Sequence, residues 1–137
     1  MSSAPASGKS VMARILVIDD EELIRTSIRL ILETNGYDVV EAENGEDGIE
    51  RQRETPFDVV ITDILMPGKE GIETIIELKR DYKDLKIIAI SGGARTINID
   101  YLELAKEFGA DNVLPKPFLN VELLQCVEEC LNLKEPW

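Results

Sequence analysis

The sequence predicts an α/β domain built on a doubly wound, five-stranded parallel sheet with five helices. Two observations support this prediction. Five short apolar runs alternate along the chain with segments whose apolar residues recur at helical spacing. Most of these runs are apolar at successive positions, which is typical of parallel strands covered by helices on both faces. The 137 residues suffice for one such domain, which we place at 11–135, after a flexible leader or expression remnant at 1–10.

Each predicted strand and helix is delimited by local signals. The predicted strands are 13–18, 37–42, 57–63, 85–90 and 112–114. The predicted helices are 22–36, 44–54, 70–82, 100–108 and 121–133. In chain order, Gly36 stops the first helix, Asn44 caps the second and Pro56 follows its end. Ile75 belongs to the apolar stripe of the third helix, and Gly109 stops the fourth.

Composition and charge exclude several classes of function. The net charge of −12 disfavours direct binding to nucleic acid phosphates. No apolar run reaches the roughly 18–20 residues that cross a bilayer, and no export signal is recognisable, so we expect a cytoplasmic protein without a membrane partner. The chain has no histidine, which excludes a Ser-His-Asp or Cys-His catalytic set. Cys126 and Cys130 are interpreted as small apolar residues rather than a zinc site or a disulfide.

Polar side chains follow the apolar strands where each one ends. The first strand ends at Asp19 and Asp20, the third at Asp63, the fourth at Ser91 and the fifth before Lys116. The carboxyl ends of parallel strands share one edge of the sheet, so these side chains are expected to converge there. Three close carboxylates repel one another and favour a hard cation such as Mg²⁺. A carboxylate beside Mg²⁺, a lysine and a hydroxyl can attack a phosphoryl group and form an aspartyl-phosphate.

Four fragments in this order resemble the response-regulator receiver family of two-component signal transduction. They are ILVIDDE, DVVITDILMPGKEG, AISGG and GADNVLPKPF, and the resemblance that they support extends over nearly the whole chain after the leader. The resemblance implies a flavodoxin-like sheet with the strand order 2-1-3-4-5. It also implies a cytoplasmic phosphorelay protein that switches conformation on phosphorylation. Such a protein catalyses only its own phosphorylation and dephosphorylation and is otherwise not an enzyme.

The resemblance assigns a role to each residue of the predicted site. Asp63 would be the phosphoacceptor, with Ser91 and Lys116 holding the phosphoryl oxygens. A cis Lys116-Pro117 bond would aim the lysine into the site. The protein ligands of Mg²⁺ would be Asp20, Asp19 through water, Asp63 and the backbone carbonyl of Leu65.

The resemblance also implies partners for phosphorylation and for signalling. A sensor histidine kinase or a phosphotransfer protein would donate the phosphoryl group, since this chain has no histidine of its own. A homodimer through the face formed by the fourth helix, fifth strand and fifth helix is one option. The cognate kinase, the signal and the output target stay open, as does the choice between a stand-alone protein and a domain of a larger one.

The sequence departs from the family pattern at three places. Val113 stands where the family commonly has the Tyr or Phe of its aromatic switch. The stretch between Ser91 and Lys116 is long, and Gly92-Gly93 and Arg95 predict a mobile loop there. Glu70 stands where an Asp is common before Gly71, with little expected effect. The phosphorylation chemistry should survive these changes, while the output geometry should be unusual.

Two alternative functions remain open at this point. The first is a receiver-shaped binding module that does not use phosphate, which only Val113 supports. The second is a phosphatase with an aspartate nucleophile. Such enzymes carry the nucleophile on the first strand with a second Asp two residues later, whereas here Asp19 and Asp20 are adjacent and Glu22 comes next but one.

Overall fold

A computed structural model describes residues 13–64, 71–91 and 98–134 of the chain. The strands are β2 (Arg14–Ile18), β3 (Asp38–Ala42), β4 (Val59–Asp63), β5 (Lys86–Ser91) and β6 (Asn112–Pro115). The helices are α2 (Glu22–Thr34), α3 (Gly45–Glu54), α4 (Gly71–Asp81), α5 (Asn98–Glu107) and α6 (Asn120–Lys134). The elements alternate as predicted, and their bounds agree with the prediction to within two residues.

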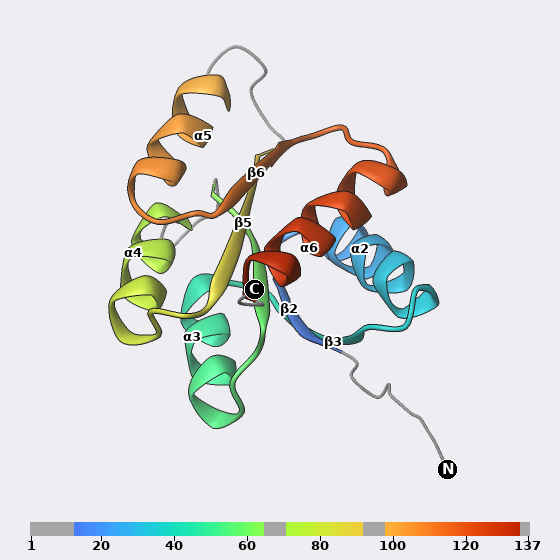
Figure 1. Cartoon of the computed structure of the whole chain (residues 1–137), viewed down its shortest axis with the longest axis horizontal. Helices are drawn as coiled ribbons and strands as arrows, with labels where there is room; N and C mark the ends of the chain where they lie inside the picture. Colours follow the sequence, from blue (N-terminus) through green and yellow to red (C-terminus); the bar gives the residue numbers. More distant parts are fainter. Residues whose placement is uncertain (1–12, 65–70, 92–97, 135–137) are drawn as a thin grey trace.

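The five strands form one parallel sheet in the order β3-β2-β4-β5-β6. Numbered along the chain, this is the order 2-1-3-4-5, so the predicted topology is confirmed. Helices α3, α4 and α5 lie on one face of the sheet, and α2 and α6 lie on the other (Figure 1). None of the described helices is both long enough and apolar enough to cross a membrane.

Each strand contributes to two apolar cores, which explains its nearly continuous hydrophobic sequence. In β2, Leu16 and Ile18 pack beneath α3 and α4, whereas Ile15 and Val17 pack beneath α2 and α6. All four side chains are fully buried. The sheet is therefore covered on both faces, as the apolar runs predict.

The ends of the elements show why some predicted bounds shifted. The amide of Tyr37 donates to the carbonyl of Leu32, so Tyr37 belongs to the turn that ends α2 and not to β3. Gly36 adopts a φ of 92°, the left-handed conformation expected at this stop. The amide of Phe57 donates to the Gln52 side chain at 3.0 Å, and β4 begins two residues later.

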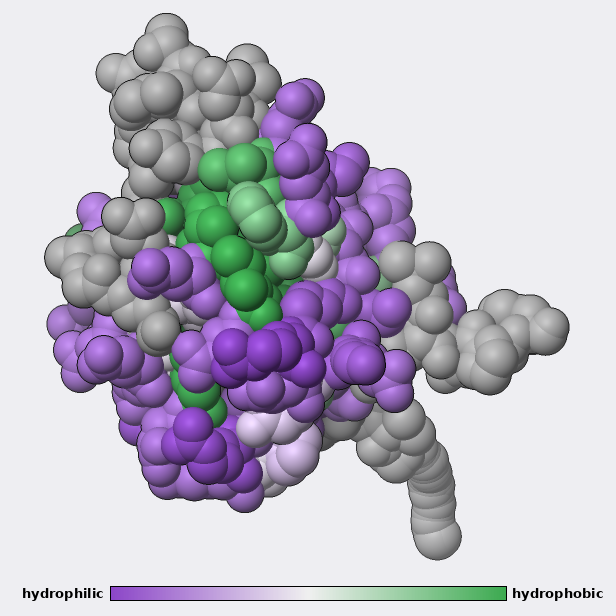
Figure 2. All heavy atoms as spheres, turned by 90° about the vertical axis from the view of Figure 1, so that its left-hand side faces the viewer, coloured by the Kyte–Doolittle hydropathy of each residue, from purple (hydrophilic) through white to green (hydrophobic). Residues whose placement is uncertain are grey.

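Helices α4 and α5 leave an apolar area at the surface (Figure 2). Ile76 on α4 and Leu104 on α5 are well exposed for large apolar side chains, as is Phe108 just after α5. Hydrophilic residues lie below this area and to its right in the same view.

Candidate functional site

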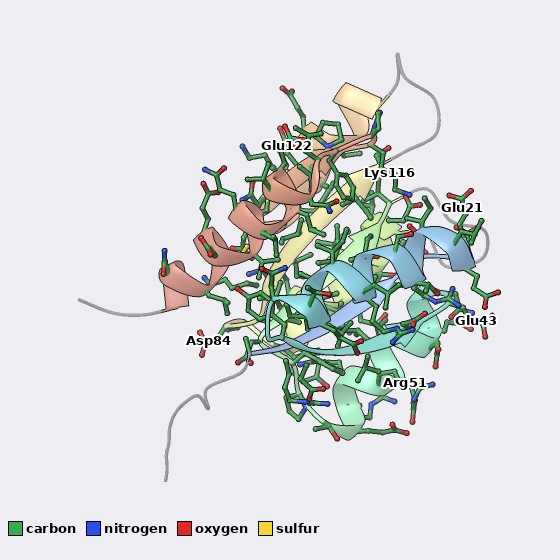
Figure 3. All side chains as sticks on the ribbon, turned by 90° about the vertical axis from the view of Figure 1, so that its right-hand side faces the viewer. Glu21, Glu43, Arg51, Asp84, Lys116 and Glu122 are labelled. Atoms are coloured by element: carbon green, nitrogen blue, oxygen red, sulfur yellow. The ribbon has the colours of Figure 1, made fainter. Side chains whose placement is uncertain are left out.

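The carboxyl ends of the strands bring the predicted site residues to one edge of the sheet. Asp19 follows β2, Asp63 ends β4, Ser91 ends β5 and Lys116 follows β6. Figure 3 shows Lys116 and Glu21 at this end of the molecule, with Asp84 at the opposite end. The segments converge although the chain separates Asp19 from Lys116 by 97 positions.

Three carboxylates gather at this edge, as predicted. One oxygen of each of Asp19, Asp20 and Asp63 lies within 4.8 Å of the other two. Asp19 and Asp63 are buried, whereas Asp20 is exposed to solvent. A cluster of oxygen ligands that is buried on one side and open on the other suits a hard divalent cation that retains some of its water.

Lys116 provides positive charge inside this acidic cluster. Its Nζ donates to Asp19 Oδ2 at 3.0 Å and lies 3.6 Å from Asp63 Oδ2 and 3.9 Å from Glu21 Oε1. The Lys116-Pro117 peptide bond is cis, as predicted. The backbone amide of Lys116 also donates to the Ser91 carbonyl at 2.9 Å, which fixes the lysine beside the end of β5.

The sheet register places Ser91 next to the phosphoacceptor candidate. Asp63 pairs with Ile90, the residue that precedes Ser91, and Ser91 itself pairs with Pro115. The serine is fully buried. Ser91 therefore lies at the same edge of the sheet as Asp63 and Lys116, which is the convergence that the sequence predicts.

The backbone of Asp19 is held by a residue that the sequence analysis did not single out. Arg25, in the first half of α2, donates from Nη1 to the Asp19 carbonyl at 2.8 Å and from Nε to Glu41 Oε1 at 2.7 Å. The available signal in the sequence is a pair of opposite charges, Arg25 in the helix that follows the acidic pair and Glu41 in the next strand. That signal is weak because surface ion pairs of this kind are common.

Some of the predicted features lie outside the described residues. These are Leu65 with its carbonyl, Glu70, the glycine pair Gly92-Gly93, and Arg95. Val113 is described: its side chain is half-buried and packs against the core beneath α3, α4 and α5. At this position the chain therefore places a small aliphatic group and no aromatic ring.

Comparison with known proteins places this fold and site in a family. The family described as the response regulator receiver domain matches residues 15–128. The chain is 36% identical over 121 residues to the chemotaxis protein CheY of Bacillus subtilis, covering 87% of this chain and 98% of CheY. It is 35% identical over 118 residues to the transcriptional regulatory protein ResD of the same organism, covering 86% of this chain and 48% of ResD.

A solved structure shows the same fold. The response regulator receiver domain protein from Clostridium thermocellum superposes with a TM-score of 0.83 at 33% sequence identity. The match covers 90% of this chain and 97% of that one. The chain thus spans nearly all of CheY and of this receiver structure, but only about half of ResD.

Receiver domains are signalling modules. The function of the family is to accept a phosphoryl group on an aspartate, and histidine kinases supply that phosphoryl group. They bind Mg²⁺ through acidic residues, and this chain has an acidic cluster formed by Asp19, Asp20 and Asp63. The matched sequence, the shared topology and this cluster show that the chain belongs to the response regulator receiver family of two-component signal transduction.

Proposed function

We propose that this chain accepts a phosphoryl group on Asp63 from a partner phosphohistidine in a Mg²⁺-dependent reaction, and that it signals by changing conformation. The observation that carries the proposal is the position of Lys116. Its ammonium group lies between the buried carboxylates of Asp19 and Asp63, at 3.0 and 3.6 Å. A fixed cation beside a nucleophilic carboxylate is what phosphoryl transfer requires, since negative charge develops on the transferred group.

The donor set fits Mg²⁺. The carboxylates of Asp19, Asp20 and Asp63 offer oxygen ligands close enough to share one ion. When bound, Mg²⁺ would neutralise charge on the oxygens of the transferred phosphoryl group. We assign Asp20 and Asp63 as direct ligands, Asp19 as a ligand through water, and the carbonyl of Leu65 as the remaining protein ligand.

The proposed transfer is a displacement at phosphorus. A carboxylate oxygen of Asp63 attacks the phosphorus atom of the donor, a P–O bond forms, and the P–N bond to the donor imidazole breaks. The imidazole leaves with the bonding electron pair and takes a proton from solvent. Lys116 and the Ser91 hydroxyl donate hydrogen bonds to the phosphoryl oxygens. Asp63 is then an acyl phosphate, whose later hydrolysis restores the carboxylate.

The composition supports the assignment of partners. The chain contains no histidine, so the phosphohistidine comes from a sensor kinase or a phosphotransfer protein. The net charge of −12 disfavours direct contact with nucleic acid. We propose a cytoplasmic module at about 11–135 that turns over no substrate other than its own phosphoryl group. A homodimer through α5, β6 and α6 belongs to the same proposal.

The experiment is phosphorylation by a small donor. Incubation with acetyl phosphate and Mg²⁺ should add one phosphoryl group, seen by intact-mass spectrometry, and excess EDTA should prevent the addition. Asp63→Asn should abolish it. Asp111→Asn is a matched control, because Asp111 also pairs with a lysine, Lys79, at 3.0 Å but lies outside the site. An Asp63→Asn protein that incorporates as much phosphate as the Asp111→Asn protein would refute the proposal.

A further inference from the structure

The backbone and side chain of Asp19 are fully engaged by their surroundings. Its Oδ2 accepts from Lys116 Nζ, and its Oδ1 accepts from the amide of Glu21 at 2.9 Å. Its amide donates to the Ala42 carbonyl at 3.2 Å, and its carbonyl accepts from Arg25 Nη1 at 2.8 Å. Four separate groups thus determine how the chain leaves β2.

The carbonyl of Asp19 affects the orientation of the next residue, Asp20. This carbonyl and the amide of Asp20 belong to one planar peptide unit. The side chain of Asp20 is exposed and makes no hydrogen bond or ion pair with the rest of the described chain. The direction in which the Asp20 carboxylate leaves the backbone therefore depends on that peptide plane, and Arg25 fixes the plane from its carbonyl side.

Arg25 is itself held in one orientation. Its Nε donates to Glu41 Oε1 at 2.7 Å, and the second oxygen of Glu41 accepts from Arg29. Glu41 lies on β3 in register with Val17 of β2, two residues before Asp19. Burial opposes ionisation of Glu41, but the hydrogen bonds and charges of Arg25 and Arg29 outweigh it and lower the pKa of this carboxyl. Glu41 therefore stays ionised and keeps the guanidinium beside the Asp19 carbonyl.

We infer that Arg25, oriented by Glu41, is a positioning residue of the phosphorylation site: it holds the Asp19–Asp20 peptide so that the Asp20 carboxylate is presented to Mg²⁺. This inference rests on the proposed function. Among the described residues, no hydrogen bond or ion pair joins Arg25 to a side-chain oxygen of Asp19, Asp20 or Asp63, and its contact with Asp19 is through the backbone carbonyl. Residues that orient metal ligands in this way commonly affect metal affinity by about 10- to 100-fold.

Removal of Arg25 has opposite effects under two physical accounts. A guanidinium near the site repels a divalent cation, so loss of the charge alone would tighten Mg²⁺ binding. Loss of positioning would instead weaken it, because Asp20 would sample orientations that do not face the ion. The sign of the change in affinity therefore separates positioning from simple electrostatics.

The test compares Arg25→Gln with Arg29→Gln. Arg29 carries the same charge on the same helix and contacts the same glutamate, but its described contacts are with Glu33 and Glu41 and not with Asp19. Mg²⁺ dissociation constants are measured from amide chemical shifts in a titration with MgCl₂. We expect Arg25→Gln to weaken binding by about tenfold and Arg29→Gln to leave it unchanged or slightly tighter. At limiting Mg²⁺, phosphorylation of Arg25→Gln by acetyl phosphate should be slow, and saturating Mg²⁺ should restore it.

Equal affinities in the two variants, or tighter binding in Arg25→Gln, would overturn the inference. If Arg25→Gln does not fold, Glu41→Gln provides a second test. It keeps an acceptor oxygen but loses the charge that orients the guanidinium. Loss of that negative charge weakens Mg²⁺ binding under both accounts, so the decisive result in this variant is an unchanged Mg²⁺ affinity, which would overturn the inference. If the unmodified chain neither binds Mg²⁺ nor gains phosphate, the proposed function is wrong. If the unmodified chain does both, a negative result with the variants concerns only the role of Arg25.

Discussion

Gly71, the first residue of α4, lies close to the backbone at the proposed phosphoacceptor, Asp63. A Cβ atom added there would lie 2.4 Å from the Asp63 carbonyl oxygen and 2.3 Å from the Cα of Ile64. Both contacts are far below van der Waals separation, and both atoms belong to the main chain at the end of β4. Gly71→Ala therefore has to displace either α4 or the backbone that carries the Asp63 side chain.

The size of the effect depends on the atoms that the new methyl group meets. Overpacking a buried site typically costs about 1–3 kcal/mol. Main-chain atoms yield less readily than a side-chain tip, so we expect Gly71→Ala to lower the free energy of unfolding by about 3 kcal/mol. We also expect phosphorylation by acetyl phosphate to slow at least roughly tenfold, because a displaced backbone carries Asp63 away from Lys116.

Gly48→Ala is the matched control. Its Cβ would lie 2.3 Å from Cδ1 and 2.8 Å from Cγ1 of Ile18, and both of these atoms belong to a side chain and not to the main chain. We expect a shift of the Ile18 side chain to relieve part of the contact without moving the main chain, and alanine gains about 1 kcal/mol over glycine inside a helix. The net loss should therefore be about 1 kcal/mol or less, with phosphorylation unaltered.

Urea denaturation followed by far-UV circular dichroism measures both losses, and intact-mass time courses measure phosphorylation. The reasoning fails if the two variants lose the same stability, or if Gly71→Ala is phosphorylated as fast as the parent. Either result would mean that the close approach of α4 to β4 is relieved without moving the phosphoacceptor.

Three further predictions concern charged and titratable groups. Lys116→Gln leaves two buried carboxylates without their cation, so the free energy of unfolding measured by urea denaturation in EDTA should fall by roughly 3 kcal/mol. Added Mg²⁺ should reverse this loss, and equal losses with and without Mg²⁺ would contradict the prediction. Burial raises the pKa of Cys126 and Cys130, the latter to about 12, so iodoacetamide at about pH 8 should label neither thiol until urea unfolds the chain. The pKa of Glu41 is lowered from its ordinary 4.5, so its negative charge stabilises the fold above that pH. The loss of stability in Glu41→Gln, relative to the parent, should therefore shrink as the pH falls below 4.5. A loss that stays constant down to about pH 3 would contradict a stabilising role for the Glu41 charge.

The strand ends were predictable from sequence because apolar runs stop at polar residues. Asp63 and Ser91 close their strands in the structure where the sequence places them. The start of β4 was less predictable, since Phe57 is apolar and continues the run. In the structure its amide is taken by Gln52, a side chain on the preceding helix. Such a side-chain to backbone bond leaves no trace in hydrophobic periodicity.

The parts of the site that depend on tertiary contact could not be predicted. The bond from Arg25 to the Asp19 carbonyl depends on the angle at which α2 packs on the sheet. The approach of Gly71 to Asp63 depends on the path of the chain between β4 and α4. Residue types and order predict which groups converge on an edge, but they do not predict which backbone atoms those groups contact.

The ion pair between Lys116 and Asp19 also has a mechanical consequence. Strand β2 lies near the middle of the sheet and β6 lies at its edge, with β4 and β5 between them. The pair therefore ties an edge strand to an interior strand across the open ends of two others. In the phosphorylated form that we propose, the phosphoryl group on Asp63 would compete with Asp19 for the same ammonium group, and the ion pair of Lys116 would pass from β2 to β4. Helices α5 and α6 contact β6, so they are the first elements that a change in the ion pair of Lys116 would affect.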